Sequence, residues 1–382
     1  MDFTFDTEQH ALREAVAGLL QRAYDPEKRR AVTKEDPGFD EKTWAQLAEM
    51  GVLGLPFAEA DGGMGAGHAE VALVATEIGK VLAPEPFVES VVLAGGLVSA
   101  VGTPEQRAEL LGPLAEGTSL VVLAHAEPGH RWTPTATAVT AVQSGEGWTL
   151  SGVKEPVPSG ARADVLVVSA AVEGGTALFV VRADAAGLTR DGYRSHDGTR
   201  VARVTLDGTP AELLGEGTAD RTADVEQALA RATVAYAHEA VGAMQTALTT
   251  TSEYLKTRKQ FGVPLSRFQA LTFRAADMYV SLELVRSSAL WATMVVDAED
   301  STPEAVLAAA DRARLQTSKA GRHIGKEAIQ LHGGIGVTAE YSVGHYTSRL
   351  TAIDHLLGDG AWATNRLAAR VDDYDTVEAL PA

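Results

Sequence analysis

The chain has 382 residues, 45% of them hydrophobic, and its 33 basic and 51 acidic residues give a formal net charge of −18. The length predicts two or three domains, and the acidic balance argues against binding to nucleic acid or an anionic membrane surface, since both need a local excess of Lys and Arg. The sequence has no cysteine, which excludes disulfides, thiolate metal sites and cysteine nucleophiles. It shows no basic signal peptide and no apolar run of about 18 residues, so we expect a cytoplasmic protein that does not cross a membrane.

The first third of the chain has the hydrophobic spacing of helices. Apolar residues recur three and four positions apart in residues 7–24 and 40–50, which is one face of a helix. Two more apolar segments, residues 68–81 and 87–101, end at Pro and Gly and are also expected to be helical.

Short strands are predicted from about residue 119. Residues 135–142 alternate Thr with Ala or Val, as a half-buried strand does. Five further apolar runs are separated by Gly, Asp and Ser, at residues 119–124, 148–153, 164–170, 176–181 and 201–206. Runs at this spacing are typical of a small antiparallel barrel or sandwich.

Long helices return at about residue 220. Apolar residues from Val225 to Leu248 indicate one long helix, and Ser266 with Gln269 matches a capping box that opens the next. The acidic residues 297–300 are expected to form a solvated turn.

A third long helix has clear end signals. Thr302 and Pro303 suit an N-cap and a first helical position, and Gly333-Gly334 suits the helix end. We therefore predict an α+β, mostly α fold with an N-terminal helical domain (residues 1–117), a middle β-barrel or sandwich domain (118–217) and a C-terminal four-helix bundle (218–382).

The common catalytic motifs are absent from this sequence. It contains no P-loop, no His-Glu-x-x-His and no Gly-x-Ser-x-Gly, and its ten histidines lack the spacing of metal ligands, so no metal is expected. Residues 334–339 match the glycine pattern of dinucleotide-binding folds. They follow a predicted helix rather than a strand, and we reject them as a Rossmann signal.

Two segments of the last domain combine charge, an aromatic ring and glycines. Residues 258–265 read Arg-Lys-Gln-Phe-Gly-Val-Pro-Leu at a helix end. Arg258 could hold a phosphate there and Phe261 could lie against a flat ring. Alternatively, Arg258 and Lys259 only favour the helix dipole and Phe261 belongs to the core.

The second segment, residues 330–336, places a carboxamide before a glycine cluster. Gly333 and Gly334 would let a ligand reach the backbone beside Gln330, but glycines are equally what the end of a helix needs.

Together these segments resemble the acyl-CoA dehydrogenase family. The resemblance is carried by Arg-Lys-Gln-Phe-Gly-x-Pro-Leu-x-x-Phe-Gln at residues 258–269 and Gln-x-x-Gly-Gly-x-Gly at residues 330–336, and the domain order agrees over nearly the whole chain. It implies an FAD flavoprotein that acts on an acyl-CoA and passes electrons to an electron-transfer flavoprotein. It also implies a homodimer or homotetramer, or a heterotetramer with a paralogous subunit.

The resemblance also assigns residues to FAD. In the family the Arg of the first motif contacts the diphosphate of the neighbouring subunit's FAD, the Phe packs on the adenine side, and the Gln and glycines of the second motif line the dinucleotide. The residues implied to contact FAD are Arg258, Gln260, Phe261, Phe268, Gln269, Gln330, Gly333 and Gly334, with Ala126 and Pro158 facing the flavin ring.

The family chemistry is removal of two hydrogens across Cα–Cβ of a CoA thioester. A carboxylate takes the α-proton, hydrogen bonds to the thioester carbonyl stabilise the enolate, and the β-hydrogen leaves as hydride to flavin N5. The usual Glu-Gly position holds Leu357-Gly358 here, and Asp359 is the nearest carboxylate. A second family position, on the long helix, corresponds to Ala232, with Glu239 two turns further on. Asp359 is the first candidate base and Glu239 the alternative.

The flavin-facing segments also depart from the family. Ala126 stands where Thr is common, and Pro156-Val157-Pro158 replaces Trp-x-Thr, so Pro158 offers neither an amide nor a hydroxyl to the flavin edge. An active dehydrogenase with an atypical base is the first hypothesis. The alternatives are a partner subunit without a base, a flavin monooxygenase of the same fold, or a binding protein without flavin.

Overall fold

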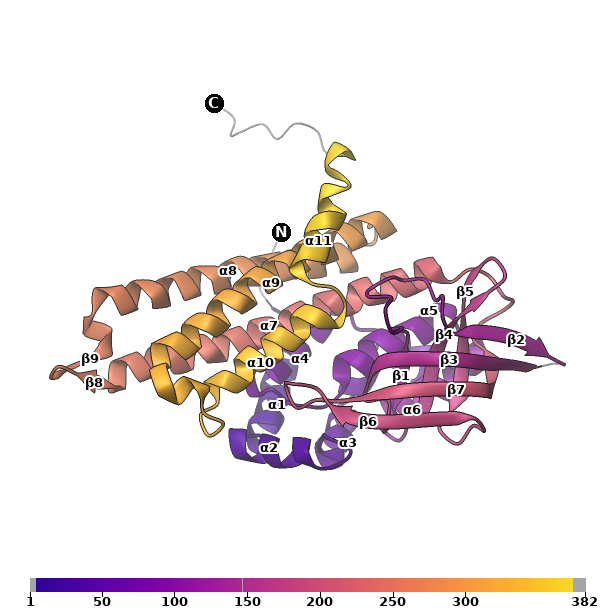
Figure 1. Cartoon of the computed structure of the whole chain (residues 1–382), viewed down its shortest axis with the longest axis horizontal. Coiled ribbons are helices and arrows are strands. Elements are labelled where there is room, and N and C mark those ends of the chain that lie inside the picture. The colour runs from indigo at the N-terminus through magenta and orange to yellow at the C-terminus, as the bar shows by residue number, and fades with distance from the viewer. Residues whose placement is uncertain (1–4, 146, 374–382) are drawn as a thin grey trace.

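The computed structural model describes residues 5–145 and 147–373. Helices form both ends of the described chain and strands form its middle, which confirms the mostly helical α+β prediction (Figure 1). The N-terminal helices are α1 (Thr7–Ala23), α2 (Pro26–Lys34), α3 (Glu41–Glu49), α4 (His68–Val81), the π-helix η3 (Phe87–Gly95), α5 (Gly96–Val101) and α6 (Pro104–Ala115), with short 3-10 turns η1 (Val52–Gly54) and η2 (Glu59–Asp61) after α3.

The middle strands close into a small barrel. They are β1 (Val121–Ala124), β2 (Thr140–Ser144), β3 (Gly147–Pro158), β4 (Val165–Val172), β5 (Gly175–Arg182), β6 (Leu188–Arg194) and β7 (Arg200–Leu213). The pairings β4–β2, β2–β3, β3–β7, β7–β5 and β5–β4 complete a ring, with β1 added beside β4 and β6 beside β7.

Two details of the strand prediction are wrong. The barrel is not purely antiparallel, because β1 pairs parallel with β4 at Val121–Val165 and β2 pairs parallel with β4 at Thr140–Ala171. The β2–β3 hairpin separates β1 from β4, so the chain returns to the sheet by a crossover and not by a tight turn. Residues 135–139 are not a strand, because the carboxylate of Glu127 takes the backbone N–H groups of residues 137–139.

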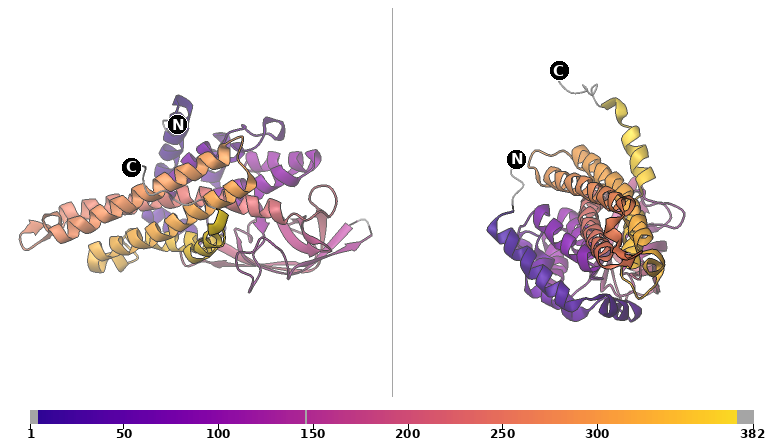
Figure 2. Two further views of the ribbon diagram at one scale, coloured as in Figure 1. Left: turned by 90° about the horizontal axis from the view of Figure 1, so that it is seen from above. Right: turned by 90° about the vertical axis from the view of Figure 1, so that its left-hand side faces the viewer.

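Four long helices of the C-terminal part run side by side (Figures 1 and 2). They are α7 (Thr222–Thr257), α8 (Gln269–Asp297), α9 (Pro303–His332) and α10 (Val343–Leu356); the remaining elements are the hairpin β8 (Lys259–Gln260) and β9 (Val263–Pro264), the 3-10 turns η4 (Leu265–Arg267), η5 (Gly333–Val337) and η6 (Val371–Asp373), and α11 (Gly360–Ala368). None of the helices in the described part of the chain combines the length and apolarity that crossing a bilayer requires.

The helix ends of the bundle test three sequence signals. Thr302 caps α9 with Pro303 at its first position, and Gly333 ends it at φ 65°, as predicted. The capping box at Ser266 is wrong: Ser266 lies inside the 3-10 turn η4, and α8 begins after Phe268 without a side-chain cap.

The acidic residues 297–300, at the end of α8, have a further role besides the predicted solvated turn. The Asp297 carboxylate accepts hydrogen bonds from the backbone N–H groups of His68 (2.7 Å) and Ala69 (3.0 Å). Gly67, the N-cap of α4, has no side chain of its own for this role. Asp297 therefore caps a helix of the N-terminal part, a contact between residues too distant in sequence for a local pattern to reveal.

A glycine contact fixes the N-terminal helices on the bundle. A Cβ at Gly79 of α4 would overlap the carbonyl oxygen of Glu239 on α7, and a Cβ at Gly242 would overlap that of Thr76. The two helices therefore approach at backbone distance, which sets the position of Glu239.

We expect Gly79→Ala to lower the free energy of unfolding by about 1–3 kcal/mol, since the helices must move apart to admit one methyl group. Urea unfolding followed by circular dichroism measures the change. Gly112→Ala in α6 is the control, because its Cβ would meet nothing within 4 Å. Equal stability of the two variants would contradict the close approach.

Candidate active site

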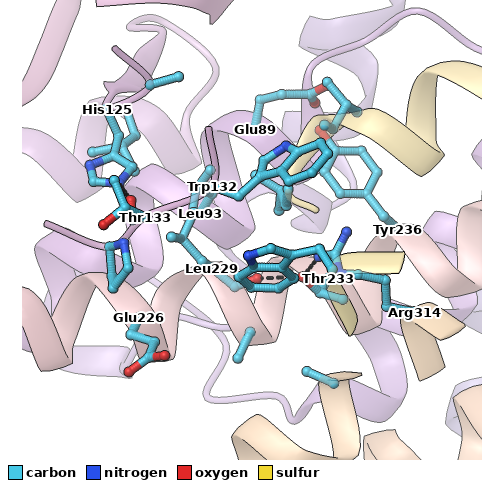
Figure 3. Close-up of a pocket in the computed structure, with 18 of the residues that line it drawn as sticks. Glu89, Leu93, His125, Trp132, Thr133, Glu226, Leu229, Thr233, Tyr236 and Arg314 are labelled. Atoms are coloured by element: carbon cyan, nitrogen blue, oxygen red, sulfur yellow. Dashed lines mark hydrogen bonds between the residues drawn. The ribbon is translucent and has the colours of Figure 1, made fainter. Parts of the chain in front are cut away.

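One cavity lies between the barrel and the C-terminal helices (Figure 3). The ends of β1 and β3 and the loop after β1 form its strand wall; η3, α7, α9, the α10 end and α11 form its helix wall. Most of the lining is apolar, including Leu93, Val122, Leu229, Leu307 and Leu357. A largely apolar cavity with few polar groups is the usual form of a small-molecule site.

The strand wall presents His125, Ala126, Pro156 and Pro158 to this cavity. His125 Nε2 donates to the Thr133 carbonyl (2.7 Å), so Nδ1 accepts the Ser169 hydroxyl (2.8 Å). Burial, together with the nearby Lys154 ammonium, lowers the pKa of His125 to about 4. His125 is therefore a neutral, fully engaged side chain at neutral pH and acts as part of the wall.

An ion pair behind the wall fixes these strands. Lys154 is 0% exposed, and its Nζ donates to Glu127 Oε1 (2.7 Å), the His125 carbonyl (3.0 Å) and Ser169 Oγ (3.1 Å). Burial lowers the pKa of Lys154 to about 8, against the attraction of Glu127. Burial of Glu127 acts to raise its pKa, but the Lys154 bond and backbone N–H donors outweigh it and lower the pKa to about 2.

The helix wall carries a buried arginine. Arg314 Nη1 donates to the Gly358 carbonyl (2.7 Å) and Nη2 donates to the Thr233 hydroxyl. Burial lowers the pKa of Arg314 to about 10. Beside it, Arg366 bonds Asp311 and Glu226, both at 2.9 Å, and lies over the Trp362 ring. These contacts attach α11 to α9 and α7 and hold Trp362 in the cavity.

Trp132 closes the cavity from the strand side. Its backbone is left-handed (φ 58°), its Nε1 donates to the His355 carbonyl (3.1 Å), and its ring meets the Trp362 ring edge-on at 6.4 Å. A bulky residue at positive φ is uncommon and needs support from its surroundings. Trp132 therefore joins the loop after β1 to the C-terminal helices across the cavity.

Sequence reasoning missed Glu89 and Tyr236. Both line the cavity, and Figure 3 shows them near each other, across from His125 in this view. Burial raises the pKa of Glu89; the nearby Arg349 and the Tyr236 hydroxyl oppose this shift. The available signal was a single Glu inside the apolar run of residues 87–95.

Neither candidate base reaches this cavity. The Asp359 carboxylate caps α11 by accepting the Trp362 N–H (2.8 Å). Glu239, only 2% exposed, forms an ion pair with Arg349 (2.6 Å). Neither residue is part of the lining, whereas Leu357 is. The structure gives both carboxylates a structural role, and their role as a base stays a prediction.

The two segments predicted to contact FAD, residues 258–269 and 330–336, meet at the opposite end of the bundle from the barrel (Figure 1). Tyr254, one turn before Arg258, stacks on His332 with ring centroids 4.4 Å apart, and His332 stacks on Tyr341 at 4.9 Å. The ends of α7 and α9 are therefore adjacent, although 74 residues separate Arg258 from His332.

The tip of the β8–β9 hairpin is a strained turn. Phe261 and Gly262 both have positive φ (52° and 81°), the form of a two-residue hairpin loop. Phe261 is consequently 92% exposed, with only the edge of Phe268 at 6.2 Å. The alternative that Phe261 is a core residue is wrong.

Four polar side chains and two glycines of the two motifs are also accessible. The side chains of Arg258, Gln260, Gln269 and Gln330 are exposed, and a Cβ at Gly333 or Gly334 would meet nothing within 4 Å. Within the described chain Arg258 has no carboxylate within 4 Å. An unpaired guanidinium, three carboxamides, a flat ring and open backbone form a donor set that fits a dinucleotide diphosphate and base.

The barrel-facing residues and the bundle-end residues do not share one cavity. Ala126 and Pro158 line the cavity at the barrel, whereas none of the bundle-end residues does. The barrel side offers fewer donors, since neither Pro156 nor Pro158 has an N–H.

Comparisons with known proteins cover most of the chain. The family models for the acyl-CoA dehydrogenase N-terminal and C-terminal domains match residues 6–118 and 222–371. Acyl-CoA dehydrogenase IpdE2 of Mycolicibacterium smegmatis is 31% identical, over 95% of this chain and 99% of its own. The Tcur3481–Tcur3483 steroid ACAD (G363A variant) is 33% identical with a TM-score of 0.87, over 96% of this chain and 98% of that one. The ChsE4–ChsE5 complex of Mycobacterium tuberculosis is 27% identical with a TM-score of 0.89, over 98% and 100%.

Proposed function

Because this chain belongs to the acyl-CoA dehydrogenase family, we propose that it takes part in the FAD-dependent α,β-dehydrogenation of an acyl-CoA thioester. The observation that carries the proposal is the apolar cavity between the barrel and helices η3, α7 and α9, whose strand wall contains the residues that the family resemblance places at the flavin ring. We further propose three domains with boundaries at residues 117 and 217. The cytoplasm as its compartment stays a prediction.

The residues of this chain supply binding, orientation and exclusion of water. Leu93, Leu229 and Leu307 give the acyl group an apolar surface, and Trp132 with Trp362 covers the cavity. The Lys154–Glu127 pair holds the strand wall rigid behind His125. A dry, rigid cavity strengthens each hydrogen bond made to a thioester carbonyl inside it.

FAD is the proposed cofactor, held at its diphosphate by Arg258, at its adenine by Phe261, and along the dinucleotide by Gln260, Phe268, Gln269, Gln330, Gly333 and Gly334. Ala126 and Pro158 would face its ring. When bound, the flavin supplies a hydride acceptor for the β-hydrogen of the substrate. Because one subunit does not bring both sets of residues to one cavity, a dimer or dimer of dimers is part of the proposal, with an electron-transfer flavoprotein as electron acceptor.

A second candidate function is a partner subunit without its own base. Four observations favour it: Leu357 and Ala232 occupy the two family base positions, Asp359 caps a helix, and Glu239 pairs with Arg349. The similar ChsE4–ChsE5 structure is of a complex of two chains. In this case the chain lends Arg258 and its neighbours to the FAD of a paralogous subunit.

Replacement of Asp359 by Asn tests whether Asp359 is the base of an active dehydrogenase. Asn is as good an N-cap as Asp, so folding and bound FAD should be retained. If Asp359 is the base, anaerobic reduction of the flavin by acyl-CoA falls by about 10²–10⁴-fold. In a partner subunit the rate does not change. Stopped-flow absorbance at the flavin band measures it, on the protein alone and with a co-expressed paralogue, and undiminished reduction excludes Asp359 as the base.

We expect Arg258→Ala to weaken FAD binding by about 1.5–3 kcal/mol, the contribution of one charge-assisted hydrogen bond. Equilibrium dialysis followed by flavin absorbance measures the retained cofactor. Lys256→Ala, also exposed near the end of α7, serves as the control for charge alone. Full flavin occupancy in Arg258→Ala would contradict the assignment of the diphosphate to this residue.

A further inference from the structure

Of the acidic residues in the helix wall of the cavity, Glu226 and Asp311 pair with Arg366, and Glu89 is the third. Glu89 is the single charged residue of η3, whose other residues are apolar or small. Its neighbour Ser90 is accounted for, because the Ser90 hydroxyl donates to the Val121 carbonyl (2.7 Å). Glu89 lines the main cavity, and also a smaller cavity beside Arg349.

Arg349, the cation near Glu89, already pairs with two other carboxylates. Arg349 Nε bonds Glu239 (2.6 Å) and its Nη1 bonds Asp197 (3.0 Å), with all three residues buried. Within the described part of the chain Glu89 forms no ion pair, and its pKa is raised by burial. The carboxyl oxygens of Glu89 can accept hydrogen bonds from a ligand in the cavity.

Tyr236 completes a polar pair in the same wall. The ring of Tyr236 is almost fully buried on α7, and Figure 3 shows its polar end near Glu89. The lining of the same cavity includes Leu93, Leu229 and Leu356, so the pair lies in a largely apolar cavity. Polar groups placed in this way in an apolar cavity select a ligand by leaving unpaired any polar group that the ligand does not satisfy.

We propose that Glu89 and Tyr236 bind a neutral oxygen function, a hydroxyl or a ketone, carried by the acyl group away from its thioester. The inference rests on the proposed function for the thioester and adds the substrate class. A hydroxyl can donate to the Glu89 carboxyl group and accept from the Tyr236 hydroxyl, and a ketone can accept from the Tyr236 hydroxyl. A carboxylate is disfavoured at this point, because Arg349 already pairs with Glu239 and Asp197.

Matched pairs of thioesters test the proposal by binding, without relying on turnover. Straight-chain acyl-CoAs from butanoyl to dodecanoyl, each with its ω-hydroxy and ω-carboxy partner, are titrated into the purified holoprotein by calorimetry. Tryptophan fluorescence gives a second readout, since Trp132 and Trp362 line the cavity. At the chain length that reaches the pair, we expect the ω-hydroxy thioester to bind about tenfold more tightly than the plain one, and the ω-carboxy thioester to bind no better than the plain one.

The variants assign this preference to residues. Glu89→Leu and Tyr236→Phe should each reduce the preference to about twofold or less, whereas Glu89→Gln, which keeps a donor and an acceptor, should retain most of it. Glu85→Gln is the matched control: Glu85 is also buried in a Glu–Tyr pair, with Tyr24, but outside the main cavity. Tyr236→Phe keeps the test informative if Glu89→Leu does not fold.

Two results would overturn this inference and leave the proposed function intact. One is equal binding of plain and ω-hydroxy thioesters at every chain length, and the other is a preference that persists in both Glu89→Leu and Tyr236→Phe. Tightest binding of the ω-carboxy series would also overturn it and would assign the recognition to Arg349. Failure of every thioester to bind would instead remove the proposed acyl-CoA function, and the inference with it.

Discussion

Arg349→Met is expected to lower the free energy of unfolding by about 3–5 kcal/mol, because it leaves two buried carboxylates without their cation. Arg349 lies on α10, Glu239 on α7 and Asp197 in the loop between β6 and β7, so one side chain joins the C-terminal helices to the barrel. Arg29 of α2 extends the cluster by donating to the backbone carbonyls of Asp197 (3.1 Å) and Leu82 (2.7 Å).

Urea unfolding at pH 7 measures this loss. Lys256→Met is the matched control, because Lys256 and Glu253 form an ion pair of similar length (2.7 Å) in which both side chains are more than 60% exposed. An exposed pair contributes about 0–1 kcal/mol, so the control should be near wild type. A second substitution, Glu239→Gln, should return part of the stability that Arg349→Met removes. Equal stabilities of Arg349→Met and Lys256→Met would show that the cluster contributes nothing as a unit.

The Arg349 result also bears on the alternative base. Glu239→Gln alone removes a carboxylate that pairs Arg349, so its activity loss would be inseparable from a loss of structure. Arg349→Met can lower the urea concentration at which the protein unfolds and leave the rate of FAD reduction per folded molecule unchanged. In that case the ion pair with Arg349 does not prepare Glu239 to act as a base. A base released from its ion pair would instead change the pH profile of reduction.

Local pattern was enough to predict most elements of this fold. Thr302-Pro303 and Gly333 set the ends of α9 through capping and backbone geometry, which depend on neighbouring residues only. The pairing of β1 with β4 and the cap that Asp297 provides to α4 depend on residues 44 and about 229 positions apart. Contacts between residues so far apart leave no periodic pattern in the sequence. The Arg349 cluster is also built from such contacts.

The candidate site also has parts that the local sequence predicts and parts that it does not. The two motifs of the proposed FAD site could be predicted because glycines, a guanidinium and carboxamides lie within two short segments. In the structure, the ring contact between Tyr254 and His332 brings these segments together. The cavity could not be predicted, because its wall combines a few residues from each of β1, η3, α7, α9 and α11, which are far apart in the sequence. Glu89 was missed because a lone Glu in an apolar helix has no motif, and only the wall around it gives it a role.

The Glu127–Lys154 pair predicts the second large effect. Glu127 Oε1 accepts from Lys154 Nζ (2.7 Å) and the Val139 N–H (3.0 Å), while Oε2 accepts from the N–H and hydroxyl of Thr137 (both 2.9 Å) and the Ala138 N–H (2.8 Å). A Gln at this position must turn an NH₂ group toward one of these donors and leaves Lys154 as an unpaired buried cation. We therefore expect Glu127→Gln to cost about 3–5 kcal/mol of stability at pH 7.

The pH dependence of this loss has a definite sign. The pKa of Glu127 is lowered to about 2 in the folded protein, below its value in the unfolded chain. Its contribution is therefore complete above about pH 4.5 and is lost as the pH falls toward 2, because the unfolded chain then binds the proton more readily. The difference in unfolding free energy between wild type and Glu127→Gln should be largest near neutral pH and should shrink below about pH 4.5.

Glu155→Gln is the control for the loss of one negative charge near β3. Glu155 pairs with Arg203 at 2.6 Å, but that arginine side chain is 46% exposed, so we expect a loss of less than about 1 kcal/mol. Since Glu127 holds the loop that carries His125 and Ala126, Glu127→Gln should also release bound FAD more readily than Glu155→Gln does. Denaturant unfolding at pH 3, 5 and 7 with flavin absorbance records both quantities. A constant difference across this pH range would mean that the Glu127 carboxylate is not held ionised by Lys154, and the rigid strand wall would then need another cause.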